Sequence, residues 1–413
     1  MKIEKPRGTR DFLPDEMEKR RLIEKKMREI AESFGYREVL TPTFEHLELF
    51  TLKSGEEIVE EMYTFKDKGG RDLALRPEVT MPVTRLFVNE CSVMPKPLRF
   101  YYFANCFRYE RPQKGRYREF WQFGVELIGS SKPTADAEVI YLAYKILKEL
   151  KIDFELHIGH VGVLRHLLRD LSEEDTLKIM RLIDKRDLDA LNNYMEEIGL
   201  NKDLKEKIYY VIDLTGGREI LNDAKILDFD FSHLEQLCDL LDALDVDYKL
   251  NLGIARGLDY YTGVVFECYS ERLGAQKQIC GGGSYELTHL FNYERVPSTG
   301  FAIGFDRVAE ICDIKPERKT TVAVVSFEGF EKEAFKLAER LRERGIVAFV
   351  DVMQRSIKRQ LSYANDVKAD YAVIIGKREI EENIVSLKDL STGKQISLSL
   401  DEAIDLILSR NGV

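Results

Sequence analysis

The sequence lacks the long apolar runs and the leader segment that would direct it to a membrane. No apolar stretch in its 413 residues reaches the roughly 20 residues that a membrane-spanning helix needs. The N-terminus, MKIEKPRGTRDF, has no apolar core of a secretory signal. We therefore expect a cytoplasmic protein with no membrane partner.

Cysteine is scarce and poorly spaced for covalent or metal chemistry. The 6 cysteines are scattered, and no two of them form a CxxC pair. In a chain of this length such spacing is typical of reduced thiols, not of a disulfide framework or a zinc site. His157 and His160 have no cysteine or carboxylate set beside them, so a structural role is the favoured interpretation for both. The sequence assigns no protein ligand to a metal ion.

An excess of positive charge is also missing, since 62 Lys and Arg stand against 72 Asp and Glu, a net charge of −10. This balance argues against a protein that coats nucleic acid, but it allows a focused basic site, because local fields matter more than the sum. The segment 107–129, FRYERPQKGRYREFWQFGVELIG, contains such a focus. Its ends are strand-like, and its middle carries Arg111, Lys114, Arg116 and Arg118.

The order of patterns in the first part of the chain predicts an α+β architecture. A helical period marks residues 13–36 and 134–150. Short strand patterns between these helices, at 71–78, 97–110 and 118–129, favour an antiparallel sheet, because they follow one another with only turns between them.

Helical patterns then dominate up to about residue 250, where strand patterns resume. A helical block between two sheet-rich blocks is most simply an inserted domain. After a charged linker that contains Pro316, strands and helices alternate, which predicts a small α/β domain. The predicted ranges are 1–164 and 248–315 for the two parts of the sheet domain, 165–247 for the helical insertion and 320–413 for the α/β domain.

Glycine-rich phosphate loops of the common kinds are missing. The chain has no Walker A loop, and GGGSYE at 281–286 lacks the GxGxxG spacing. Two interpretations of that segment stay open. It is either a close approach of the backbone to a small ligand or a turn or bulge in a strand.

Several charged or amide side chains lie inside otherwise apolar strand patterns. Each one alone is most simply a surface residue or part of a structural ion pair. Together they favour one cavity with carboxylates for an ammonium group and arginines for phosphates. A carboxylate that attacks ATP needs this combination, because the arginines stabilise charge on the phosphates. These residues are Glu78, Arg108, Gln122, Glu126, Arg256 and Arg307.

The arginine-rich segment resembles the motif 2 hairpin of class II aminoacyl-tRNA synthetases, in the form found in histidyl-tRNA synthetases. KPRGTRDFLPDE, MYTFKD, LRPEVT, ARGLDYYTGVVFE and TGFAIGFDR also resemble that family, in order and over nearly the whole chain. The most specific is RGLDYYTGVVFE, which resembles the family's histidine-recognition signature. The resemblance implies a six-stranded antiparallel catalytic sheet with helices, a helical insertion, a C-terminal anticodon-binding α/β domain and a homodimer formed around Pro42.

The resemblance further implies a two-step reaction. Histidine and ATP, with Mg²⁺ accompanying the ATP, would give histidyl-adenylate, and the histidyl group would pass to the 3′ end of tRNA(His). Arg256 would take the place of a catalytic magnesium ion. Arg108 would hold the α-phosphate, Phe120 would stack on adenine, and Arg307 would bind the ATP phosphates.

Contacts with histidine and tRNA follow from the same resemblance. Arg111 and Gln113 would approach the acceptor end of tRNA(His), with its extra 5′ guanosine. The residues implied in histidine binding are Glu78, Thr80, Gln122, Glu126, Tyr260, Tyr261 and Tyr285.

The sequence departs from the family's usual residues in two places. Ser284 and Glu286 stand where arginine and aspartate are usual, and Asp306 stands where glutamate is usual. We assign no role to Ser284, and we expect Asp306 at most to orient Arg307.

Two alternative functions are open to a chain of this kind. One is a catalytically inactive, histidine-sensing regulatory paralogue of ATP phosphoribosyltransferase, which lacks the anticodon-binding domain and the ATP-clamping arginines. This chain keeps Arg108, Arg256 and Arg307 and has a terminal α/β pattern, which favours the enzyme. The other is a class II synthetase of different specificity. ARGLDYY argues against it, because two tyrosines beside two carboxylates suit a hydrogen-bonded imidazole.

Overall fold

The computed structural model describes residues 3–54, 56–110, 116–255, 260–274 and 277–409. The chain divides into two compact units, Met1–Lys315 and Pro316–Val413. No helix in this described part of the chain is both long and apolar enough to cross a membrane.

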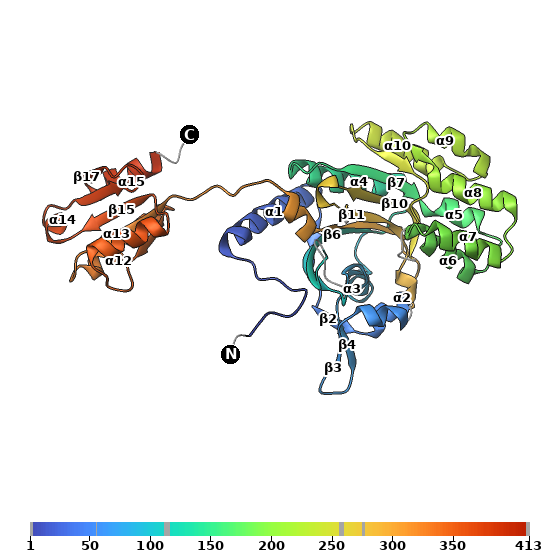
Figure 1. The fold of residues 1–413 in the computed structure, drawn as a ribbon, viewed down its shortest axis with the longest axis horizontal. Coiled ribbons are helices and arrows are strands. Elements are labelled where there is room, and N and C mark those ends of the chain that lie inside the picture. Colours follow the sequence, from blue (N-terminus) through green and yellow to red (C-terminus); the bar gives the residue numbers. More distant parts are fainter. Residues whose placement is uncertain (1–2, 55, 111–115, 256–259, 275–276, 410–413) are drawn as a thin grey trace. The chain divides into compact units, whose positions relative to one another are not determined.

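A large sheet forms the centre of the first unit (Figure 1). Within the described residues it has nine strands. In order across the sheet they are β1 (Arg37–Glu38), β5 (Leu98–Phe107), β6 (Glu119–Ile128), β12 (Ser298–Gly304), β11 (Gln278–Tyr285), β10 (Tyr261–Tyr269), β7 (Glu155–His160), β9 (Lys249–Asn251) and β8 (Thr215–Gly216).

The antiparallel sheet that was predicted is confirmed, but its expected number of strands is not. In sheet order, each strand from β5 through β6, β12, β11 and β10 to β7 pairs antiparallel with the next. Three further strands of two or three residues extend this set at its edges. Strand β1 pairs parallel with β5 and β9 pairs parallel with β7, whereas β8 pairs antiparallel with β9. Strand β8 escaped prediction because a strand of two residues has no measurable alternation.

Strands β5 and β6 form the predicted hairpin. Their register runs without a break from the pair Leu98 and Ile128 to the pair Phe107 and Glu119. Side chains alternate between the faces of a strand, so the even-numbered residues from Phe120 to Glu126 share one face. The tip of the hairpin, at 111–115, lies outside the described residues.

Two long helices, α1 (Pro14–Ser33) and α4 (Pro133–Glu149), match the predicted ones. Each begins with a proline in its first turn, where the missing N–H would have no partner in any case. Helix α4 contacts β6, β11 and β12, and α1 packs against α4. Helix α1 buries Ile23, Met27 and Ala31 at four-residue spacing. The two helices therefore cover one face of the sheet.

A small sheet and several short helices complete the surroundings of the hairpin. The small sheet has the order β2 (Phe44–His46), β4 (Asp72–Leu75), β3 (Thr64–Lys66). The short helices are α2 (Glu48–Ser54), α3 (Thr80–Leu86) and α11 (Phe305–Ile311), with single-turn segments η1 (Glu56–Glu61), η2 (Phe87–Cys91), η4 (Glu271–Leu273) and η5 (Thr288–Phe291).

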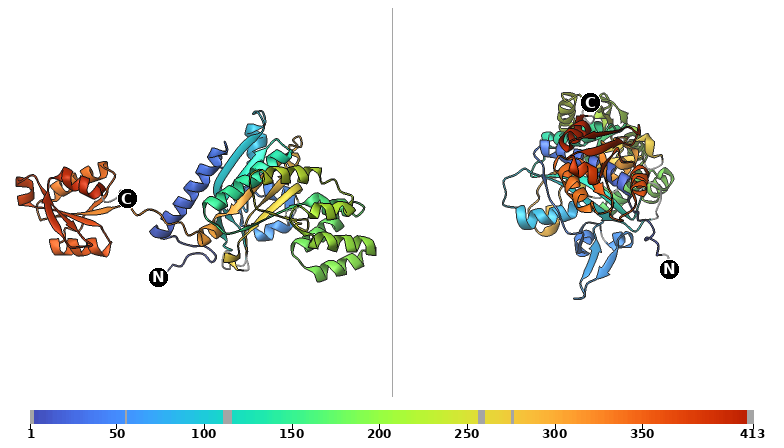
Figure 2. Two further views of the ribbon diagram at one scale, coloured as in Figure 1. Left: turned by 90° about the horizontal axis from the view of Figure 1, so that it is seen from above. Right: turned by 90° about the vertical axis from the view of Figure 1, so that its left-hand side faces the viewer.

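The stretch predicted as helical is helical, apart from the two-residue strand β8. It contains α5 (Val161–Leu167), α6 (Glu173–Asp184), α7 (Leu188–Glu197), α8 (Lys202–Asp213), α9 (Ile220–Asp223), η3 (Ala224–Leu227) and α10 (Ser232–Asp242). Side chains of Ser172, Asp187 and Asn201 cap three of these helices. The helices gather beside the β7 and β10 side of the sheet in Figures 1 and 2 and share its apolar core. Their status as a separate domain stays a prediction.

The second unit is the predicted α/β domain. Its sheet has the order β14 (Val347–Val350), β13 (Thr321–Ser326), β15 (Tyr371–Ile375), β16 (Val385–Asp389), β17 (Gln395–Leu398), with the first three strands parallel. Its helices are α12 (Glu331–Glu343), α13 (Ile357–Asp366), α14 (Lys377–Glu381) and α15 (Leu400–Ser409). Val322 and Val324 pack with α12 and α15, whereas Ala323 and Val325 pack with α13. Helices cover both faces of the sheet, as parallel strands require.

Candidate active site

A cavity of about 370 Å³ opens in the first unit, where the predicted site residues meet. All of them that the structure describes line this cavity. They are Glu78, Thr80, Arg108, Phe120, Gln122, Glu126, Tyr260, Tyr261, Tyr285 and Arg307. The remaining predicted residues, Arg256, Arg111 and Gln113, lie outside the described residues.

The sheet brings these side chains together from distant parts of the sequence. Strand β6 supplies Phe120, Gln122 and Glu126 from one face, as its alternation requires. Strands β12, β11 and β10 lie beside it in that order, so Tyr261 and Tyr285 reach the same cavity although they follow far later in the chain.

Glu126 is the centre of one end of the cavity. It is 2% exposed. The hydroxyl of Thr80 donates to its Oε1 at 2.9 Å, and the hydroxyl of Tyr285 donates to its Oε2 at 2.5 Å. Burial and the Glu126 charge raise the pKa of Tyr285 well above its usual value, so this phenol keeps its proton and acts as the donor. Two donors thus hold the carboxylate in place.

Glu78 forms a second carboxylate in the cavity wall. It accepts hydrogen bonds from the backbone N–H groups of Thr80 at 2.7 Å and Met81 at 3.1 Å. These N–H groups belong to the first turn of α3, where backbone donors lack partners within the helix and a negative charge is stabilised. Two carboxylates in one cavity wall suit a cationic ligand.

Aromatic rings surround this end. The ring centroids of Tyr260 and Tyr261 lie 4.6 Å apart, and those of Tyr260 and Tyr285 lie 5.7 Å apart in an edge-to-face arrangement. Burial, followed by the charges of Glu126 and Glu78, raises the pKa of Tyr102 well above its usual value. Tyr102 is therefore neutral, and a phenol hydroxyl is suited to hydrogen bonding with a polar ligand.

The other group of side chains is cationic. Arg307 donates from Nη1 to the carbonyl of Gln278 at 2.6 Å. Burial and the neighbouring Arg116 and Arg108 lower the pKa of Arg307. The fold thus holds the positive charges of these arginines close together, and such a cluster favours the binding of an anion.

Arg108 and Phe120 join the cationic group to a flat apolar surface. Arg108 donates from Nε to the carbonyl of Pro77 at 3.0 Å, and its guanidinium carbon lies 5.1 Å from the Phe120 ring centroid. A phenyl face beside a guanidinium group suits a stacked nucleobase whose phosphates reach the arginines.

The cavity also includes residues that the sequence did not single out as site residues. Asp184 is the last residue of α6, and no local pattern in a helix end predicts its approach to a distant sheet. Trp121 borders the cavity and also stacks on Phe103, with the ring centroids 5.0 Å apart. Further lining residues are Glu110, Arg116, Tyr117, Glu267, Gln278 and Asp306.

The glycine-rich segment 281–283 lies within strand β11, not in a turn. A side chain at Gly282 would collide with the backbone of Gly300 on β12 and would lie 2.7 Å from Cβ of Phe301. Gly281 also lines the cavity. These glycines therefore allow close packing between strands beside the site.

Ser284 contacts a buried carboxylate behind the cavity wall. Its hydroxyl donates to Oδ1 of Asp136 at 2.8 Å, and Nε2 of His233 lies 2.8 Å from Oδ2 of the same residue.

Nδ1 of His160 accepts a hydrogen bond from the backbone of Gly162 and caps α5. His157 pairs with Glu155 at 3.1 Å. These contacts give His157 and His160 structural roles.

All 6 cysteines are free thiols and buried. Within the described ranges, no three or more His, Cys, Asp or Glu side chains are grouped so as to hold a metal ion.

Comparison with protein families assigns both units. Residues 8–308 match the family described as histidyl-tRNA synthetase. Residues 319–410 match the family described as anticodon binding domain. The second match coincides with the α/β unit.

Curated relatives match along nearly their whole length. The chain is 64% identical over 408 residues to the histidine–tRNA ligase of Archaeoglobus fulgidus, which covers 98% of this chain and 100% of the relative. It is 52% identical over 410 residues to the histidine–tRNA ligase of Methanosarcina acetivorans, with 98% of this chain and 99% of the relative covered.

Solved structures share the fold. The apo histidyl-tRNA synthetase of S. aureus is 29% identical, with a TM-score of 0.73 and coverage of 98% of this chain and 100% of that one. A Bacillus halodurans structure described as an ATP phosphoribosyltransferase regulatory subunit/histidyl-tRNA synthetase is 28% identical, with a TM-score of 0.80 and coverage of 91% and 99%. The chain belongs to the histidyl-tRNA synthetase family.

Proposed function

We propose that the protein is a histidine–tRNA ligase, which activates histidine with ATP and transfers the histidyl group to the 3′ end of tRNA(His). One observation carries this proposal. The carboxylates of Glu78 and Glu126 and the guanidinium groups of Arg108 and Arg307 line the same cavity. A substrate with a cationic end and a substrate with phosphates can meet there.

Histidine occupies the carboxylate end. Glu78, Glu126 and Gln122 bind its ammonium group and side chain, while Tyr260 and Tyr261 offer hydroxyls to the imidazole. Thr80 and Tyr285 act on Glu126, which they hold by hydrogen bonds. A pocket that pairs both ring nitrogens rejects amino acids that lack them.

ATP occupies the cationic end. Adenine stacks on Phe120, Arg108 binds the α-phosphate and Arg307 binds the other phosphates. The histidine carboxylate attacks the α-phosphorus, the bond to pyrophosphate breaks, and histidyl-adenylate forms. Arg256 stabilises the charge that develops on the α-phosphate. Mg²⁺ accompanies ATP and neutralises part of the phosphate charge.

Transfer to tRNA follows at the same place. A ribose hydroxyl at the 3′ end attacks the carbonyl carbon of the adenylate, and AMP leaves. Arg111 and Gln113 approach this acceptor end, and the Pro316–Val413 unit binds the anticodon, which is supported by its family match. The protein acts as a cytoplasmic homodimer, with the segment around Pro42 at the interface.

Histidine-dependent exchange between ATP and pyrophosphate tests the first step. Charging of tRNA(His) transcripts with and without the extra 5′ guanosine tests the second step. We expect exchange with histidine alone among the amino acids, and preferential charging of the transcript with the guanosine. Binding of histidine without any exchange would refute the enzyme and favour the regulatory paralogue.

A further inference from the structure

The N-terminal segment at residues 5–12 lies across the beginning of β6. The carbonyl of Gly8 accepts a hydrogen bond from the backbone N–H of Arg118 at 2.9 Å. Gly8 has a φ of +86°, and a Cβ at this position would lie 2.7 Å from Cγ of Arg118. A glycine is therefore required for this close approach.

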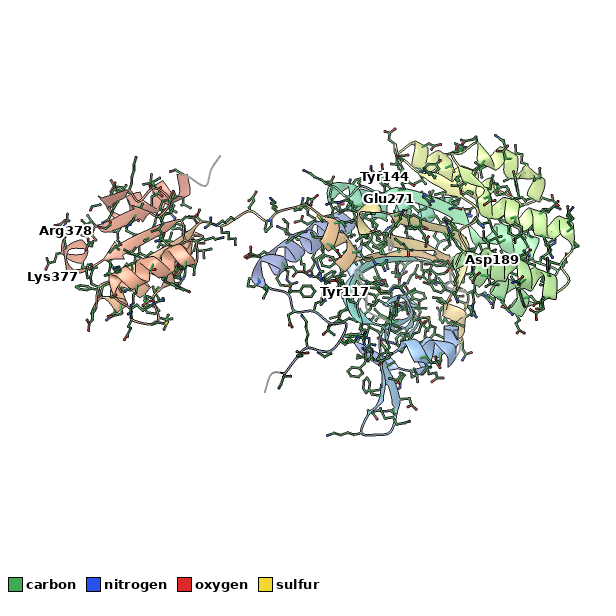
Figure 3. The ribbon with its side chains drawn as sticks, in the orientation of Figure 1. Tyr117, Tyr144, Asp189, Glu271, Lys377 and Arg378 are labelled. Atoms are coloured by element: carbon green, nitrogen blue, oxygen red, sulfur yellow. The ribbon has the colours of Figure 1, made fainter. Side chains whose placement is uncertain are left out.

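Arg10 continues the contact with the same region. Its guanidinium carbon lies 3.8 Å from the ring centroid of Tyr117, which Figure 3 labels beside the chain leading into α1. Its Nη2 donates to Oδ1 of Asp306 at 2.7 Å. Arg10 thus links the N-terminal segment both to the end of the arginine-rich hairpin and to α11.

Asp306 receives two more donors. Nη1 of Arg20, from α1, donates to Oδ1 at 2.8 Å, and the backbone N–H of Trp121 donates to Oδ2 at 2.6 Å. Asp306 is 6% exposed and Arg20 is 5% exposed. A buried carboxylate is stable here because every one of these bonds is charge-assisted. We call Asp306, Arg10 and Arg20 the brace.

The brace joins the two elements that carry the nucleotide side of the cavity. Trp121 lies between Phe120 and Gln122 on β6, and Asp306 immediately precedes Arg307 on α11. A hydrogen bond between Asp306 and the backbone of Trp121 therefore sets the position of the Phe120 ring relative to the Arg307 guanidinium group.

We propose that the brace is a positioning site for ATP, through which the N-terminal segment sets the spacing between the adenine-stacking ring and the phosphate-binding arginine. Its residues act through Phe120 and Arg307 and do not themselves touch the reacting atoms. This inference rests on the proposed function, because it assumes that ATP occupies this end of the cavity.

The histidine end depends on other contacts. Glu126 lies five residues beyond Trp121 on β6, roughly 17 Å along an extended strand. Its partners Thr80 and Tyr285 come from α3 and β11. Loss of the brace should therefore change ATP binding more than histidine binding.

Pyrophosphate exchange distinguishes effects at the two ends of the cavity when the concentrations of ATP and of histidine are varied in turn. We expect Arg10→Ala to raise the KM for ATP about tenfold, because it removes a charge-assisted hydrogen bond, and to change the KM for histidine less than about twofold. Arg10→Lys should restore part of the loss, since it keeps the charge but not the planar stack on Tyr117. The KM for ATP should rise more in Asp306→Asn than in Arg10→Ala, because Asp306→Asn removes the charge that both arginines share.

Lys5→Ala is the matched control. It removes a cation from the same segment, where Lys5 lies 3.6 Å from Asp11 and both are exposed. Its KM for ATP should equal that of the unaltered protein. Thermal unfolding of each variant identifies any variant that fails to fold. If Asp306→Asn fails to fold, Arg10→Lys and Arg10→Ala still allow the KM values to be compared.

Equal changes in both KM values, or no change in either with Arg10→Ala, would overturn the positioning role. Calorimetric titration with ATP in the absence of histidine gives a readout independent of the reaction. If the unaltered protein binds ATP but shows no exchange, the proposed function fails, and weaker ATP binding by Arg10→Ala still supports the brace. If the unaltered protein binds no ATP, the brace proposal fails with it.

Discussion

Tyr285 donates its hydroxyl to Glu126 at 2.5 Å, and both residues are buried, at 3% and 2% exposure. The bond crosses from β11 to β6, with β12 between the two strands. A hydrogen bond that spans an intervening strand needs a small residue in its path. Gly300 on β12 provides it, since a side chain there would collide with the Glu126 carboxylate. The sheet is thus shaped around this carboxylate.

Replacement of Tyr285 by phenylalanine should weaken histidine binding. The change leaves Oε2 of Glu126 without this donor inside the protein, and loss of a bond to a charged group costs about 1.5–3 kcal/mol, or roughly tenfold or more in affinity. Titration calorimetry with histidine measures it. Tyr141→Phe on α4 is the control, because Tyr141 packs on Phe34 by its ring. An unchanged histidine affinity in Tyr285→Phe would show that Glu126 needs no such support.

Replacement of Gly300 by alanine should destabilise the protein and weaken histidine binding together. The added Cβ meets the Glu126 carboxylate and the carbonyl of Val125, and overpacking of this kind costs about 1–3 kcal/mol of unfolding free energy. Urea unfolding and histidine titration measure the two effects. Gly263→Ala on β10 is the control, since its nearest neighbour would be Cβ of Ser284 at 3.4 Å, an ordinary contact. Equal effects from both variants would exclude a specific role for the small residue.

Arg256→Ala should abolish histidine activation while histidine binding stays largely intact. Arg256 lies outside the described residues, and its role is inferred from the family resemblance. A cation that stabilises charge only as the α-phosphate is attacked contributes to kcat and not to binding of the amino acid. Pyrophosphate exchange and histidine titration separate the two, with the exposed Arg272→Ala as control. Near-normal exchange in Arg256→Ala would refute the catalytic role.

His160 should make the protein less stable in acid. Burial, followed by repulsion from His233, lowers the pKa of His160 from 6.5 to about 4. Between pH 6.5 and about 4, His160 therefore binds more protons in the unfolded state than in the folded state. The contribution of neutral His160 to the unfolding free energy is complete above pH 6.5 and declines as the pH falls towards 4. The full effect is about 3 kcal/mol.

His160→Asn tests this pH dependence. Asparagine keeps an oxygen that can accept from the backbone of Gly162 and cap α5, but it does not titrate. The difference in unfolding free energy between pH 7 and about pH 4.5 should shrink relative to the unaltered protein. His46→Asn, at an exposed position on β2, should leave the difference unchanged. A parallel loss of stability in His160→Asn and the unaltered protein would contradict the assignment.

Long, strongly periodic segments were predictable from the sequence. Helices α1 and α4, the β5–β6 hairpin and the alternation of the terminal α/β unit were all predicted, because each is longer than several repeats of its own period. The two-residue strand β8 was missed, since its pairing depends on β9, which lies far away in the chain.

The sequence by itself indicated some of the side chains that line the candidate site. A charge inside an apolar strand is improbable unless it is paired or functional, and the occurrence of several such residues together pointed to Glu126, Arg108 and Arg307. The family resemblance then supplied the roles expected of them.

Only the tertiary structure decided how these side chains are held. The partners of Glu126 come from positions 80 and 285, and those of Asp306 from positions 10, 20 and 121. The approach of Asp184 to the cavity likewise depends on tertiary packing, since α6 contributes Ile179 and Ile183 to the apolar core that it shares with the sheet. Such contacts arise from the strand order and from helix packing, which local periodicity does not encode. Residue types therefore indicated the chemistry, and the fold set its geometry.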